Sequence, residues 1–121
     1  METLNKIAEN LMEMTFFVGS IFFIVALIMY RFPPKKINSL YGYRTPNSMK
    51  NQERWDFAQL FSSIRMIEGG LFLVLISFLK FVYVPSPDLE LGISLGLIFV
   101  VIVYLIVSTE SALKKNFPND K

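Results

Sequence analysis

The chain has 121 residues, of which 53% are hydrophobic and 18% charged, and it contains neither cysteine nor histidine. The missing residue types exclude disulfide frameworks, thiolate or imidazole metal sites, and every catalytic set that needs a histidine. The net charge of +2 is too small to indicate nucleic acid as a partner. A mean hydropathy of +0.46 in so short a chain favours one small membrane domain spanning residues 1–121.

Three apolar stretches predict membrane-spanning helices at about residues 14–31, 66–84 and 91–109. The first and third contain long runs without charge, and 18 residues of helix reach about 27 Å, close to the hydrocarbon thickness of a bilayer. The middle stretch is interrupted by Lys80, which lies near enough to its end to reach the headgroups. We therefore expect an all-α fold, an integral-membrane three-helix bundle.

Residues before the first span have helical periodicity of their own. Apolar side chains recur at i, i+3, i+4, i+7 and i+8, namely Leu4, Ile7, Ala8, Leu11 and Met12. This segment continues the first helix outward, lies along the outer membrane surface, or docks an extracellular peptide. The sequence leaves these alternatives open.

Loop charges predict the orientation. The connection of about residues 32–65, taken with its flanking arginine, carries seven basic side chains against two acidic ones, a net charge of +5. The turn at residues 85–90 carries only Asp88 and Glu90, and the C-terminal tail is basic. The positive-inside rule therefore predicts a multi-pass protein of the bacterial cytoplasmic membrane, with the N-terminus outside and both the connection and the C-terminus in the cytoplasm.

The first half of the connection is rich in residues that form turns. Pro33 and Pro34 end the first helix because neither can donate to a helical hydrogen-bond ladder. Gly42 is expected to adopt a positive φ or to permit close approach of the backbone. Thr45 and Pro46 can start the next helix, since a proline costs nothing at its first position.

A continuous or gently kinked helix is expected from about residue 48 to residue 84, with Ser48 and Asn51 as competing N-caps. Its first third is amphipathic, with Phe57, Leu60, Phe61 and Ile64 on one face and Gln52, Asp56, Gln59 and Ser63 largely on the other. Trp55 falls near the expected inner interface, where it serves either as a belt residue or in packing or recognition.

Two further pairs stand in the spans. Arg65 and Glu68 are three residues apart, so they share a helix face and can form a structural ion pair. Alternatively, one of them bonds to the loop of residues 38–46 or binds a partner. Gly92 and Gly96 have the small-xxx-small spacing that lets helices approach closely. We expect them to pack within the bundle, with self-association as the alternative.

The connection resembles the signature of the SdpI/YfhL family of small bacterial membrane proteins. The matching residues are Asn38, then Leu40-Tyr41-Gly42-Tyr43-Arg44-Thr45-Pro46, Ser48-Met49-Lys50, Glu53, Trp55 and Ala58. The resemblance implies a three-span module with the signature between the first and second helices. It also implies immunity to a secreted peptide toxin that attacks the membrane, and a receptor role in which a cytoplasmic transcriptional repressor is held at the membrane.

Carried over by position, the candidate functional residues are Asn38, Gly42, Arg44, Thr45, Pro46, Glu53 and Trp55. From its chemistry, Arg44 can clamp an acidic group, with Glu53 as the most plausible partner, or cap the carbonyl end of the first helix. Whether the motif builds the fold or binds a partner stays open at this point.

The sequence offers no catalytic residue set and no cofactor or metal site, so we do not expect an enzyme. A second class of function is a small membrane scaffold or accessory subunit of a larger transporter or envelope complex. The glycine pair and the basic connection motivate that alternative. Membrane lipid is a partner under both hypotheses, and the oligomeric state is left open.

Overall fold

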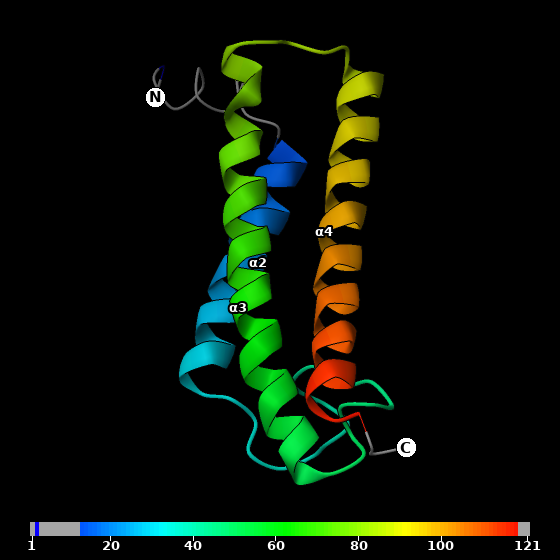
Figure 1. The fold of residues 1–121 in the computed structure, drawn as a ribbon. Coiled ribbons are helices and arrows are strands. Elements are labelled where there is room, and N and C mark those ends of the chain that lie inside the picture. The colour runs from blue at the N-terminus through cyan, green and yellow to red at the C-terminus, as the bar shows by residue number, and fades with distance from the viewer. Residues whose placement is uncertain (1, 3–12, 119–121) are drawn as a thin grey trace.

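The computed structural model describes residues 2 and 13–118 and contains three α-helices, as the all-α expectation requires (Figure 1). They are α2 (Glu13–Arg31), α3 (Gln52–Ile76), which continues as the 3₁₀ helix η1 (Ser77–Phe81), and α4 (Pro87–Asn116). No β-strand occurs in this part of the chain. The predicted amphipathic segment at Leu4–Met12 lies outside the described residues.

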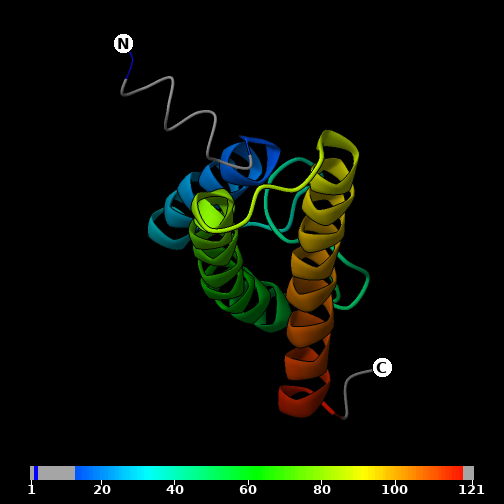
Figure 2. The ribbon, with the colours of Figure 1, turned by 90° about the horizontal axis from the view of Figure 1, so that it is seen from above.

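Helices α2 and α3 run antiparallel and side by side, while α4 stands apart from them over half of its length (Figures 1 and 2). Toward the end of the bundle that bears residues 32–51, here called the connection end, α4 and α3 converge. At the opposite end, here called the turn end, a short turn joins η1 to α4. Across that turn, Lys80 and Glu90 form an ion pair at 2.7 Å.

The helix ends follow local chemistry, with one correction to the predicted start of α3. Asn51 is its N-cap, and its side chain accepts a hydrogen bond from the backbone N–H of Arg54 at 2.9 Å. Helix α3 therefore begins at Gln52, later than the predicted residue 48. Ser48 does not cap it, because its hydroxyl closes a separate turn with Thr45.

The far end of α3 also differs from the prediction of one helix reaching Val84. The α-helix ends at Ile76 and tightens into η1. At this point the Ser77 hydroxyl donates to the carbonyl of Val74 at 2.5 Å, a local bond of the type that competes with the α-helical ladder. The chain beyond Phe81 is already part of the turn.

Glycines bring the helices together, but not the glycines that the spacing indicated. A Cβ built on Gly19 would lie 2.7 Å from the Cβ of Leu73, and one on Gly70 would lie 2.7 Å from the backbone nitrogen of Phe23. Helices α2 and α3 are thus in backbone contact, which only a residue without a side chain permits.

Helix α4 meets α3 through Gly69, whose added Cβ would lie 2.6 Å from Val101 Cγ1. A Cβ added to Gly92 or to Gly96 would meet nothing within 4 Å in the described chain. The prediction that this pair packs within the bundle is therefore wrong for the described chain. The reason is the divergence of the helices, because the pair lies in the half of α4 that stands away from its neighbours (Figure 1).

The interior of the bundle contains small polar side chains beside apolar ones such as Leu73 and Leu113, while many other apolar side chains lie on the outside. Small polar side chains such as Thr15, Ser62, Ser63 and Ser94 are buried, whereas Leu60 is 52% exposed. Helices α2 and α4 are each long and apolar enough to cross a membrane, and only 22% and 11% of their most apolar windows are buried. Exposed apolar surface of this extent is typical of helices that contact lipid and supports a membrane protein.

Candidate functional site

Glu110, near the C-terminal end of α4, is the acceptor on which the signature loop converges. Tyr43 donates its phenol O–H to Oε2 at 2.7 Å, and Thr45 donates its hydroxyl to the same oxygen at 2.9 Å. The Asn47 amide donates to Oε1 at 2.8 Å. A single carboxylate with three donors therefore fastens the connection to α4.

The phenol of Tyr43 is a stable donor in this arrangement. Burial raises the pKa of Tyr43 far above its ordinary value, and the hydrogen bond to Glu110 and the negative charge of that carboxylate raise it further. Tyr43 therefore keeps its proton at every pH at which the cell lives, and the link to α4 does not switch within that range.

Gln59 fastens the same residue to α3. Its Oε1 accepts from the backbone N–H of Tyr43 at 2.7 Å, and its Nε2 donates to the Tyr43 carbonyl at 2.8 Å. The amide is 1% exposed and satisfies both backbone groups of one residue. The sequence placed Gln59 on the polar face of the helix; of that face, Gln59 and Ser63 are buried in the bundle, whereas Gln52 and Asp56 remain exposed.

Gly42 has a φ of 109°, which confirms the predicted positive φ. Space is equally restrictive here, because an added Cβ would lie 2.5 Å from Gln59 Oε1 and 2.7 Å from Pro34 Cγ. Two independent constraints therefore require glycine at this position.

Thr45, Pro46 and Ser48 form a turn and not the first turn of a helix. The Thr45 N–H donates to the Ser48 hydroxyl at 2.9 Å, and the Ser48 N–H donates to the Thr45 hydroxyl at 3.1 Å. Pro46 follows Thr45 in this turn, where its fixed φ is favourable. The turn presents Thr45 and Asn47 to Glu110.

The expected ion pair between Arg44 and Glu53 is not formed in the described chain. The Arg44 guanidinium donates instead to the carbonyl of Ser39, within its own loop, and the side chain remains exposed. Glu53 lies exposed in the first turn of α3, where the helix dipole stabilises a negative charge. Arg44 therefore shapes the loop without anchoring it to a helix.

Asn38 and Trp55 also serve the fold of the connection. The Asn38 Oδ1 accepts from the N–H of Leu40 at 2.9 Å and of Tyr41 at 2.7 Å, an Asx turn. Trp55 is 0% exposed and donates its indole N–H to the carbonyl of Pro34 at 2.7 Å. Of its two predicted roles, packing is the one that the structure supports.

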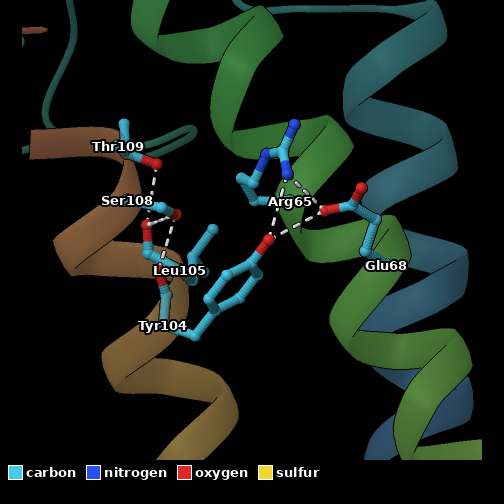
Figure 3. Close-up of polar contacts among 6 residues, drawn as sticks. All are labelled: Arg65, Glu68, Tyr104, Leu105, Ser108 and Thr109. Carbon is cyan, nitrogen blue, oxygen red and sulfur yellow. Dashed lines mark hydrogen bonds and ion pairs between the residues drawn. The ribbon is translucent and has the colours of Figure 1, made fainter. Parts of the chain in front are cut away.

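A second polar cluster lies between α3 and α4 (Figure 3). Arg65 and Glu68 form the predicted ion pair at 2.8 Å. Tyr104 joins them from α4, since its hydroxyl accepts from Arg65 at 3.0 Å and donates to Glu68 at 3.1 Å. We call these three residues the polar triad. The pair is confirmed, and Tyr104 is the member that sequence reasoning missed.

The polar triad borders a groove with a volume of about 450 Å³. Its walls come from α3 and α4, namely Glu68, Gly69, Phe72, Val100, Val101 and Tyr104. The side chain of Glu68 is 49% exposed and that of Arg65 28% exposed, so both reach the surface. The groove thus combines apolar walls with a charged and hydrogen-bonding edge.

The folded chain is an all-α protein in which two helices are long and apolar enough to cross a membrane, as in small helical membrane proteins. The profile of the SdpI/YfhL protein family matches residues 35–109, more than half of the chain. The chain belongs to the SdpI/YfhL protein family. This confirms the resemblance inferred from the signature.

One curated relative supports the assignment. The chain is 45% identical over 53 residues to the uncharacterized protein YfhL of Bacillus subtilis (strain 168). The match covers 44% of this chain and 48% of YfhL, so it spans about half of the length of that relative. No solved structure matches the chain.

Proposed function

We propose that this protein is an integral-membrane immunity protein that protects a bacterium from a secreted, membrane-active peptide toxin. Its three helices cross the cytoplasmic membrane with the N-terminus outside and the connection inside, and it performs no catalysis. Membership of the SdpI/YfhL family and the lipid-compatible surface of α2 and α4 support this proposal.

The groove beside the polar triad is the observation that carries the proposal. Ionisable side chains at membrane depth are costly, at about 2.5–3.5 kcal/mol each on insertion scales, and they mark functional positions. Here the ion pair offsets part of that cost while half of Glu68 stays accessible. A peptide inserted in the bilayer would find apolar walls for its side chains and the triad for a polar group.

The test is protection of a sensitive bacterium. Cells that express the chain are challenged with a membrane-active peptide toxin, and their membrane potential is followed with a voltage-sensitive dye. Glu68→Gln and Tyr104→Phe should reduce protection about tenfold, since a hydrogen bond to a charged group is worth about 1.5–3 kcal/mol.

Glu53→Gln is the matched control, because Glu53 lies exposed in the first turn of α3 and outside the groove. Membrane accumulation of each variant is measured in parallel. Failure of the unsubstituted chain to protect against any peptide tested, although it accumulates in the membrane, would contradict the proposal.

A receptor role would use the cytoplasmic face. The Arg44 guanidinium is exposed and makes its hydrogen bond within its own loop, so Arg44→Ala should leave membrane accumulation unchanged. If the loop holds a transcriptional repressor, the same variant loses toxin-dependent recruitment of that repressor. Co-purification from toxin-treated and untreated cells separates the two results.

One observation favours the scaffold alternative. A Cβ added to Gly92 or Gly96 would meet nothing within 4 Å among the described residues, so this face of α4 has room for another helix. If the chain is an accessory subunit, crosslinking in native membranes of unstressed cells yields a stoichiometric larger partner. Gly96→Leu abolishes that product while the bundle still folds.

A further inference from the structure

The loop of residues 38–43 holds an exposed leucine in a fixed position. Leu40 is 89% exposed. It cannot turn inward freely, because Asn38 binds the backbone N–H groups of Leu40 and Tyr41 on one side of it. Beyond it, the Tyr41 hydroxyl donates to the carbonyl of Phe32 at 3.0 Å. The hydrogen bonds of the loop therefore hold the backbone on both sides of an apolar side chain that lies on the surface.

The segment lies beside the apolar helices and not beyond their ends. Tyr41, Gly42 and Tyr43 line a pocket of about 210 Å³ together with side chains of all three helices, which are Val25, Met29, Ser62, Met66 and Leu105. The Tyr43 hydroxyl also approaches the carbonyl of Ile106 at 3.5 Å. Figure 1 places the connection at the connection end of the bundle, and Figure 2 shows part of it in line with the space between the α2–α3 pair and α4 and part of it beyond α4.

The charges within the segment that contains Leu40 are all of one sign, although Asp56 of α3 lies near Lys35 at the edge of this segment. Residues 31–44 contain Arg31, Lys35, Lys36 and Arg44 and no acidic residue, and all four basic side chains are exposed. Anionic lipid headgroups attract such clusters, and each basic residue near the surface adds to the attraction. Phe32 and Ile37 in the same stretch are exposed as well, at 66% and 37%.

We propose that residues 31–44 form a lipid-binding edge, in which Leu40 inserts into the inner leaflet and the four basic side chains bind anionic phosphates. The connection therefore re-enters the membrane boundary between its two ends. The occupant is lipid and not a soluble protein, because exposed apolar side chains (Phe32, Ile37 and Leu40) share this stretch with four exposed basic side chains, a combination that matches acyl chains beneath anionic headgroups. The inference rests on the proposed orientation and not on toxin immunity.

The sequence contains no cysteine, so a single substitution carries a single spin label. Leu40→Cys is labelled with a nitroxide and the protein is reconstituted in vesicles of phosphatidylcholine with phosphatidylglycerol. The collision rates with oxygen, which partitions into lipid, and with a water-soluble nickel chelate are then measured. Lys50→Cys, exposed in the same connection, is the control.

The expected result is a several-fold higher ratio of oxygen to nickel collisions at residue 40 than at residue 50. The ratio at residue 40 should fall when phosphatidylglycerol is omitted or when Lys35 and Lys36 are both replaced by Gln. Equal ratios at the two positions in anionic vesicles would overturn the proposal. So would a label at residue 40 that leaves water only when cytosolic protein is added.

Folding is checked independently by the fluorescence of Trp55, the single tryptophan, which is buried in the native connection. The immunity assay is scored separately on the unlabelled chain. Protection without lipid contact at residue 40 rejects the lipid-binding edge alone. Lipid contact without protection rejects the proposed function and leaves the edge in place.

Discussion

The Tyr43 phenol donates a hydrogen bond to the Glu110 carboxylate at 2.7 Å, and this contact joins two segments that lie 67 positions apart in the chain. Through it, the SdpI/YfhL signature is fastened to the helix that follows the turn end. Together with Gln59, which holds the backbone of the same tyrosine, the contact makes Tyr43 the residue through which the connection meets both α3 and α4.

Replacing Glu110 should loosen the connection. Glu110→Ala removes the acceptor of three donors, and a hydrogen bond to a charged group is worth about 1.5–3 kcal/mol, so we expect the largest loss of stability among connection variants. Glu110→Gln keeps one acceptor oxygen, so its free energy of unfolding should lie between those of Glu110→Ala and the native chain. Unfolding in mixed micelles and proteolysis between residues 38 and 50 measure this order, and Glu53→Gln should behave like the native chain.

Gly42→Ala should destabilise the protein by about 1–3 kcal/mol, because the backbone is held at a φ of 109° and the new methyl group meets Gln59. Gly92→Ala is the matched control. Its methyl group meets nothing within 4 Å, and alanine favours a helix over glycine by up to about 1 kcal/mol. Thermal unfolding in the same detergent compares them, and equal midpoints would contradict the described loop.

Gly70→Ala should separate α2 from α3, since its Cβ would stand 2.7 Å from the backbone of Phe23, which has no freedom to move aside. Gly96→Ala serves as the control on α4. Crosslinking by a short bismaleimide between cysteines introduced at residues 16 and 78, where the native phenylalanine rings lie edge to face with centroids 6.3 Å apart, reports the helix contact. Undiminished crosslinking in Gly70→Ala would show that the backbones are not in contact.

The raised pKa of Tyr43 predicts that the protein loses stability at alkaline pH. Because folding raises this pKa, the contribution of Tyr43 to stability is complete below the unfolded-state pKa of about 10 and declines as the pH rises further. In the folded protein Tyr43 should not ionise. The tyrosinate absorbance gained before alkaline unfolding should therefore be equal in the native chain and in Tyr43→Phe. A smaller gain in Tyr43→Phe would show that the phenol titrates freely.

The composition and local pattern were enough to predict the helices, the positive φ of Gly42 and the ion pair of Arg65 with Glu68. Each depends on residues close in sequence. The prediction that Gly92 and Gly96 pack within the bundle was wrong, because their spacing identifies a helix surface without side chains but not the element that packs against it. Gly19, Gly69 and Gly70 take that role, through contacts that depend on how the helices cross.

The central acceptor of the candidate site was missed for a related reason. Glu110 follows an apolar stretch as a lone acid, which in sequence is indistinguishable from an ordinary residue at the end of a span. Its donors Tyr43, Thr45 and Asn47 lie in the connection, and only the folded chain brings them to it. Gln59 likewise had the appearance of a surface residue, because what covers it is the backbone of Tyr43, 16 positions away in the chain.

The ion pair of Lys80 with Glu90 bears on how α4 can move. It pins one extremity of the helix, while Glu110 pins the other. Between these fixed points α4 touches α3 near Gly69 and Val101. With both ends tied, α4 cannot rotate away from α3 as a rigid body when a guest enters the groove. The groove would widen by bending of α4 between its two tethers, and the tethers would return the helix to its place once the guest departs.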